Sequence, residues 1–338
     1  MTERTGNPGL ARFAWTVLAY NLLVIAWGAF VRASGSGAGC GKHWPLCNGM
    51  VVPREPSTAT LIEVSHRVTS GLALVLVVVL LVLVLRNRDL PKRHPARRAA
   101  KASTFFMFTE ALVGAGLVLF ELVAHDASMK RGLSMILHLS NTFLLLGSLA
   151  VTAWSLTPKA ADDHPRASSA LVKPALWSGI VGVLLLGSSG AIAALGDTLF
   201  PAHSLSDGLA QDMSPLAHVF LRLRVLHPFL ALAVGALVFA GSTIARVTTT
   251  SPRVRLLSRI ATLAFATQFA AGLLNLFLLA PIPMQLVHLL LADATWIALV
   301  LLLWEAIYAR DQEPIKSRKG PAPISEVPPS TSNVEPVT

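Results

Sequence analysis

The sequence predicts an all-α integral membrane protein. Eight transmembrane helices form two tandem four-helix bundles, related by a pseudo-two-fold axis along the membrane normal. Three observations support this prediction. The 338 residues are 53% hydrophobic and only 14% charged, with a mean hydropathy of +0.61, which exceeds what a soluble core of this size needs. Eight apolar stretches each approach the length of about 20 residues that crosses a bilayer. The two halves also carry matching motifs in the same order.

The predicted spans divide the chain into two membrane units and their connections. The spans are 13–31, 63–85, 104–124, 133–155, 174–195, 217–245, 259–280 and 284–309. We expect a cytoplasmic N-terminus (1–12), an N-terminal bundle (13–155) with a long outer loop (32–62), a cytoplasmic linker (156–173), a C-terminal bundle (174–309) and a tail (310–338). The tail is rich in Pro, Ser, Lys and Glu without an apolar period, which predicts a disordered cytoplasmic segment.

The net charge of +10 follows the predicted topology. Lys and Arg are concentrated between the second and third spans, the fourth and fifth, the sixth and seventh, and in the tail. Because basic loops stay on the cytoplasmic side, both termini are predicted to be cytoplasmic in a multi-pass protein of the cell membrane. The charge therefore indicates a lipid bilayer as the surroundings and no nucleic-acid partner.

Local matches between the halves indicate an internal duplication. Each unit has an even number of spans, so both units cross the membrane in the same sense. Gly114 and Gly272 are small residues expected to let helices pack closely. The matched positions are Gly28 to Gly37 with Gly187 to Gly196, His66 with His227, Thr109-Glu110 with Thr267-Gln268, Gly114 with Gly272, and His138 with His288.

Four histidines near the outer ends of four spans are the leading site candidates: His66, His138, His227 and His288. An ionisable side chain inside a membrane helix is costly and is a functional candidate by default, although it could also serve as hydrogen-bonded packing. His227 is predicted to lie deeper than the other three. Alternate helices of a bundle face each other, so His66 can oppose His138 and His227 can oppose His288. Two opposed imidazoles in an apolar bundle suit the axial ligation of a haem.

Charged residues around the histidines differ between the halves. Glu63 precedes His66 by one turn, where it could accept a proton or form an ion pair with Arg67; both readings stay open. Arg224 takes the place of Glu63 in the second half. Basic residues on the outer side are candidate contacts for haem propionates: Arg32, Arg67, Lys130, Arg131, Arg222 and Arg224.

The only two cysteines, Cys40 and Cys47, lie in the first outer loop. Outside the cytoplasm a disulfide between them can form and persist. It could be a structural staple or a redox-active pair. A metal site that adds His43 is a third reading, although a stable one would usually need a fourth ligand.

Taken together, these motifs resemble the haem A synthase family over about residues 13–309. The resemblance rests on Gly28-x-x-Val31-Arg32 before Gly35-Ser36-Gly37, on the cysteines around Trp44-Pro45-Leu46-Cys47-Asn48-Gly49, on Glu63-x-x-His66-Arg67, and on the three later histidines. Where many bacterial members have Pro-Asp after the first cysteine, this chain has Gly41-Lys42-His43.

The resemblance implies a membrane oxidoreductase that converts the C8 methyl group of haem O into the formyl group of haem A, by successive hydroxylation, for terminal oxidases. It assigns His227 and His288 to a haem b cofactor and His66 and His138 to substrate haem O. Glu63 would lie near the reacting edge, and Cys40 and Cys47 would form a loop disulfide. Haem O synthase and terminal oxidase assembly factors are candidate partners, and homo-oligomerisation stays open.

Two other classes compete with this reading. A dihaem b-type electron-transfer protein would also need two bis-histidine sites in a helical bundle, but it has no use for Glu63 beside a ligand. A transporter could contain parallel repeats, but its polar groups would be expected at the midplane and not at the outer rim.

Overall fold

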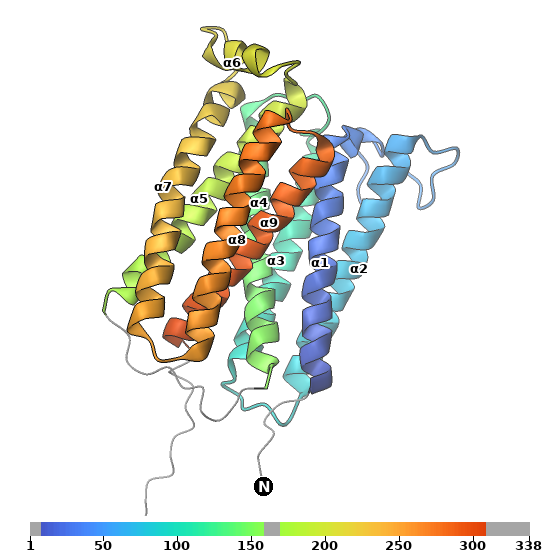
Figure 1. The fold of residues 1–338 in the computed structure, drawn as a ribbon. Coiled ribbons are helices and arrows are strands. Elements are labelled where there is room, and N and C mark those ends of the chain that lie inside the picture. Colours follow the sequence, from blue (N-terminus) through green and yellow to red (C-terminus); the bar gives the residue numbers. More distant parts are fainter. Residues whose placement is uncertain (1–7, 159–169, 309–338) are drawn as a thin grey trace, which may run out of the picture.

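The described part of the chain folds into eight long helices joined by loops (Figure 1). The computed structural model describes residues 8–158 and 170–308. Its long helices are α1 (Pro8–Ala33), α2 (Thr58–Arg86), α3 (Pro95–Leu119), α4 (Met129–Leu156), α5 (Val172–Leu199), α7 (Val219–Thr248), α8 (Pro252–Phe277) and α9 (Ile282–Leu303), which continues as a π-helical turn (Trp304–Tyr308). Two short helices, η1 (Ser36–Ala38) and α6 (Leu205–Met213), lie in the loops after α1 and α5. All eight long helices are long and apolar enough to cross a membrane, which confirms the predicted all-α membrane class with eight spans.

Helix ends differ from the predicted spans because polar caps extend helices beyond their apolar parts. The side chains of Ser57, Ser128 and Ser251 each accept a hydrogen bond from a backbone N–H in the first turn of the helix that follows. The third span was predicted to reach residue 124, but α3 ends at Leu119, before a turn with positive φ. Helix α6 was missed because it is short and not apolar enough to register as a span.

Each half forms a closed ring of four helices. Helices α1, α2, α3 and α4 pack in chain order, as do α5, α7, α8 and α9, so α2 faces α4 and α7 faces α9 across the ring centres. The rings meet where α4 packs against α5 and α9 and where α1 packs against α9. In the repeat α1 corresponds to α5 and α4 corresponds to α9. The contact between α4 and α5 therefore has a counterpart in the contact between α9 and α1. This agreement supports the two-fold relation, whose axis remains a prediction.

Aromatic packing stabilises the seam between the rings. Phe143 of α4 stacks on Trp296 of α9, with ring centroids 5.0 Å apart and an interplanar angle of 16°. The Trp296 indole N–H also donates to the backbone carbonyl of Phe143. A Cβ atom at Gly187 of α5 would lie 2.7 Å from the Phe143 ring, so glycine is required for this close approach.

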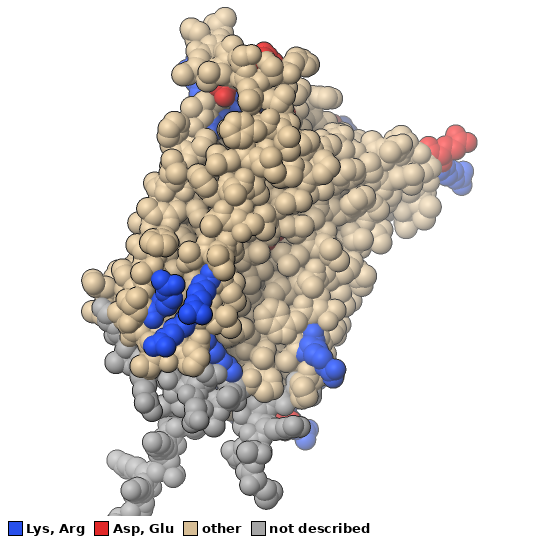
Figure 2. Space-filling model, in the orientation of Figure 1, with Lys and Arg blue, Asp and Glu red and all other residues tan. Residues whose placement is uncertain are grey.

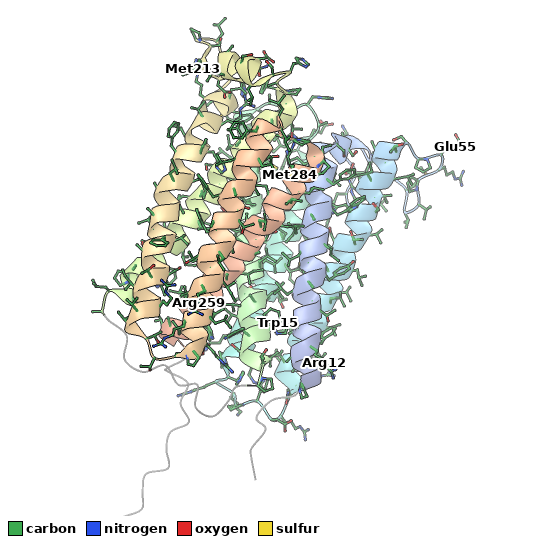
Figure 3. The ribbon with its side chains drawn as sticks, viewed as in Figure 1. Arg12, Trp15, Glu55, Met213, Arg259 and Met284 are labelled. Carbon is green, nitrogen blue, oxygen red and sulfur yellow. A yellow bond between two sulfur atoms is a disulfide. The ribbon has the colours of Figure 1, made fainter. Side chains whose placement is uncertain are left out.

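Charged side chains are absent from the middle of the face seen in Figure 2 and lie towards its two ends. On the face seen in Figure 2, most Lys and Arg side chains gather at the end where α1 begins. Arg12, Trp15 and Arg259 mark that end in Figure 3, whereas Glu55, Met213 and Met284 lie towards the other. The chain is thus a multi-pass membrane protein, and the cytoplasmic location of the basic end stays a prediction. The predicted tail and the central part of the linker lie outside the described residues.

Candidate functional site

The four histidines lie at one level, near the end of the bundles opposite the basic end, which the predicted topology makes the outer end. His66 follows the start of α2 at Thr58 by eight residues, and His138 follows Met129 of α4 by nine. His227 follows Val219 of α7 by eight residues and His288 follows Ile282 of α9 by six. At 1.5 Å per residue these depths agree to within about 5 Å. The expectation that His227 lies deeper was therefore wrong, mainly because α2 and α4 begin five and four residues before their predicted spans, whereas α7 begins two residues after its own.

The fold brings the histidines together in the predicted pairs. His66 and His138 project from the facing helices α2 and α4 and lie within electrostatic reach of each other. His227 and His288 do the same on α7 and α9. All four residues are partly buried. Each ring of helices therefore holds one opposed pair of imidazoles.

Glycines give three of the four imidazole rings their space. A Cβ atom at Gly28 of α1 would lie 2.8 Å from Cε1 of His66, and one at Gly190 of α5 would lie 3.1 Å from Cε1 of His227. At Gly272 of α8 the distance to Cε1 of His288 would be 2.7 Å. Gly272 therefore has a packing role, as expected, and the neighbour for which it leaves space is the His288 ring. Its repeat counterpart Gly114 has nothing within 4 Å of such an atom.

The ring nitrogens provide a donor set that fits haem iron. Nδ1 of His227 lies 2.8 Å from the Ser189 hydroxyl, and Nδ1 of His138 lies 3.2 Å from Oε1 of Glu110. Both contacts are made by Nδ1, so Nε2 is available to bind a metal. A histidine that binds a metal through one ring nitrogen usually has such a partner at the other. Nδ1 of His66 is buried without a hydrogen bond.

His288 is arranged differently. Its Nε2 lies 3.2 Å from the side-chain nitrogen of Gln268, while its Nδ1 is buried without a hydrogen bond. Two imidazoles per bundle, with apolar helices around them, still form the ligand set that a six-coordinate haem requires.

Glu63 and Arg67 hold the cysteine loop. The buried Glu63 carboxylate accepts from the backbone N–H of Cys40 at 2.8 Å and forms the ion pair with Arg67 that the sequence left open. The Arg67 guanidinium also donates to the carbonyls of His43 and Leu46, each at 2.6 Å. The pair therefore fixes the loop over the start of α2, whether or not Glu63 also transfers protons.

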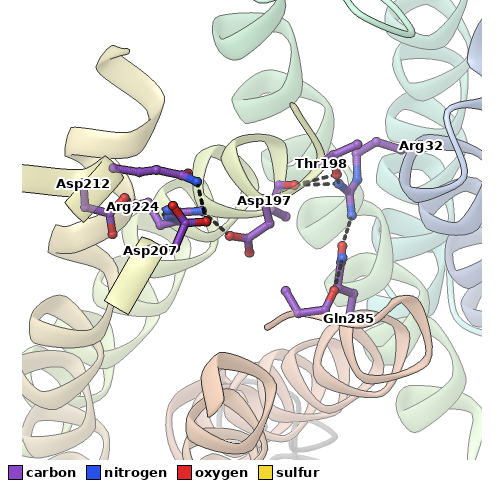
Figure 4. Close-up of polar contacts among 10 residues, drawn as sticks. Arg32, Asp197, Thr198, Asp207, Asp212, Arg224 and Gln285 are labelled. Carbon is purple, nitrogen blue, oxygen red and sulfur yellow. Dashed lines mark hydrogen bonds and ion pairs between the residues drawn. The ribbon is translucent and has the colours of Figure 1, made fainter. Parts of the chain in front are cut away.

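Arg224 has an equivalent architectural role in the second half (Figure 4). Its guanidinium donates to Asp197 of α5 at 2.7 Å and to Asp212 of α6 at 2.6 Å, which ties α6 to the outer end of the C-terminal ring. Arg32 of α1 donates to Thr198 and to Gln285 of α9, so it links the two rings. Glu63 and Arg224 therefore occupy matching positions and each holds a neighbouring segment in place, but with side chains of opposite charge.

The six candidates for propionate contacts are mostly engaged with protein atoms. Lys130 is exposed, whereas the other five donate to carbonyl, hydroxyl, amide or carboxylate oxygens. Beyond the contacts already given, Arg131 donates to the carbonyls of Ala124 and Asp126, and Arg222 donates to that of Pro215. A propionate at one of these five arginines would share or replace an existing contact.

Cys40 and Cys47 form the expected disulfide. Both residues are buried within the loop, with exposures of 0% and 2%. Gly39 lies so close to the backbone of Ala59 that a Cβ atom would come within 2.4 Å of it. The disulfide and this close approach fix the loop against α2. A reductant would reach the bond only after the loop opens.

Glu110 is a site residue that the sequence reasoning missed. The sequence comparison used Glu110 only as part of the match between Thr109-Glu110 and Thr267-Gln268. Its position beside His138 depends on how α3 is rotated against α4. The available signal was a carboxylate inside an otherwise apolar span, which is costly unless it has a partner.

Comparison with known proteins agrees with these features. The family model described as "Cytochrome oxidase assembly protein", COX15-CtaA, matches residues 11–300. The chain belongs to this family. A relative from Shouchella clausii named Heme A synthase is 34% identical over 52% of this chain and 54% of its own length. Another, from Bacillus cereus, is 40% identical over 34% of this chain and 36% of its own length.

A further relative is more similar but much longer. A Thermus thermophilus protein named Protoheme IX farnesyltransferase is 48% identical over 302 residues, which is 88% of this chain and 48% of the relative. The chain therefore spans about half the length of the relatives that it matches most extensively.

Proposed function

We propose that the chain is a haem A synthase, which oxidises the C8 methyl group of haem O to a formyl group through successive hydroxylation. The observation that carries the proposal is the pair of opposed histidines in each ring of helices, in a member of the COX15-CtaA family. Two separate sites suit one substrate haem and one cofactor haem. In this proposal one site binds the haem that is oxidised and the other binds the haem that serves as cofactor.

The residue roles follow the sequence resemblance. His66 and His138 would hold haem O, while His227 and His288 would hold haem b. Bound iron would supply the redox chemistry, and the polypeptide would bind, orient and exclude water. Glu63 lies in the substrate half, where its carboxylate is the candidate proton acceptor. To accept a proton it would have to weaken its contact with Arg67 or Cys40.

Protohaem farnesylation is a second candidate, because the relative with that name matches 88% of this chain. The name belongs to a protein about twice as long as the matched part. One pair of hosts separates the activities. In a host that makes only haem b, a farnesyltransferase would produce haem O. In a host that makes haem O but no haem A, a haem A synthase would produce hydroxylated and formyl haem.

The expected result is haem A in the second host and no haem O in the first, measured by chromatography of extracted haems. A known haem A synthase serves as the positive control. Haem b bound to the purified chain without any oxidised haem, in a host where that control works, would contradict the proposal and favour the dihaem electron carrier. Partners such as haem O synthase and oxidase assembly factors, and any homo-oligomer, remain part of the proposal.

A further inference from the structure

The Glu110 carboxylate is held beside one histidine by a defined set of contacts. Its Oε1 lies 3.2 Å from Nδ1 of His138, at ion-pair distance but without the alignment of a full hydrogen bond. Asn141 donates to Oε2 at 2.6 Å, and the Thr142 hydroxyl donates to Oε1. Asn141 is itself fixed by the Thr109 hydroxyl at 2.7 Å. The carboxylate therefore has a fixed position between α3 and α4.

The second half has a neutral group at the matching position. Gln268 of α8 corresponds to Glu110 in the repeat, and its side-chain nitrogen lies 3.2 Å from Nε2 of His288. Both rings thus place a side chain of the same length beside the second histidine of the pair. Only the N-terminal ring places a carboxylate there.

A carboxylate beside a ligating imidazole changes the metal that the imidazole holds. A carboxylate that accepts the Nδ1–H raises the basicity of the ligand, and even at ion-pair distance it adds negative charge near the iron. Negative charge in a membrane interior is poorly screened, and it stabilises the ferric state more than the ferrous state. An amide gives orientation without this charge. The two pairs should therefore hold iron at different reduction potentials.

We propose that Glu110 is a positioning residue that lowers the reduction potential of the haem held by His138, relative to the same site with a neutral partner. The inference rests on the proposed function, because it requires His66 with His138 and His227 with His288 to be haem ligands. It adds a determinant outside the ligand set, and it gives the difference between Glu110 and Gln268 a specific consequence.

Reciprocal variants test this inference. Glu110→Gln copies the partner of the C-terminal pair, and Gln268→Glu copies that of the N-terminal pair. The purified full chain with its haems is titrated by optical spectroscopy against redox mediators. We expect Glu110→Gln to change the reduction equilibrium constant of one haem at least tenfold in favour of the ferrous state. For a one-electron couple this raises the reduction potential by ~59 mV. Gln268→Glu should lower the potential of the other haem.

The controls separate a charge effect from a packing effect. Thr142→Val removes one hydrogen bond to Glu110 but keeps its charge, and we expect it to shift the potential much less than Glu110→Gln. Wild-type protein that binds fewer than two haems contradicts the proposed function itself. Two bound haems whose potentials are unchanged in Glu110→Gln overturn this inference alone. If Glu110→Gln fails to retain its haems, Gln268→Glu decides, and an unshifted potential there overturns the inference.

Discussion

Gly272 makes room for His288, so Gly272→Ala should weaken haem binding at the C-terminal pair. The added Cβ would lie 2.7 Å from Cε1 of His288, whereas ordinary contacts begin at 3.4 Å. The ring or the helix must therefore move by 3.4 − 2.7 = 0.7 Å. This exceeds the roughly 0.5 Å within which a functional geometry must be held. Disturbing the support of a metal ligand typically costs 10- to 100-fold in affinity, or about 1.4 to 2.8 kcal/mol.

Gly114→Ala is the matched control, because Gly114 is the repeat counterpart and has nothing within 4 Å of the added atom. Both substitutions raise helix propensity by about 1 kcal/mol, so this contribution cancels in the comparison. The assay is the rate of haem transfer from the purified chain to excess apomyoglobin. We expect the C-terminal haem to leave Gly272→Ala 10- to 100-fold faster, with wild-type loss from Gly114→Ala. Equal loss from both variants would refute the reasoning.

Three further predictions concern the outer side. Glu63→Gln keeps an acceptor for the Cys40 N–H but loses the ion pair with Arg67, so we expect bound haem with less oxidised product; unchanged product would remove the proton-acceptor role. Replacing Cys40 and Cys47 by serine should lower stability by about 2 to 3 kcal/mol in thermal unfolding, because the bond closes a short loop; an unchanged melting temperature would argue against a staple. Asp212→Asn weakens the ion pair with Arg224, so limited proteolysis around α6 should accelerate, and an unchanged cleavage rate would show that other contacts hold this helix.

Properties that depend on local composition could be predicted from the sequence. The eight spans followed from apolar length, and the histidine pairs followed from the rule that alternate helices of a bundle face each other. The fold agrees with both, since His66 faces His138 and His227 faces His288. Whether these residues bind haem is a prediction that the fold supports.

Other features depend on how elements rotate and dock, which a single sequence does not encode locally. The contact between Glu110 and His138 requires a particular rotation of α3 against α4. The anchoring roles of Glu63 and Arg224 depend on the path of two outer loops. Helix α6 is too short and too polar to resemble a span. Gly272 and Gly114 look alike in the repeat, yet only Gly272 lies against a histidine.

The most direct test of the account is which haem each histidine pair holds. Full-length His66→Ala and His227→Ala variants are purified from a host that makes haem b and haem O, and their haems are extracted and separated by chromatography. The account predicts that His66→Ala loses haem O and keeps haem b, whereas His227→Ala loses haem b. Loss of the same haem from both variants, or of neither, would contradict the division of the chain into a substrate half and a cofactor half.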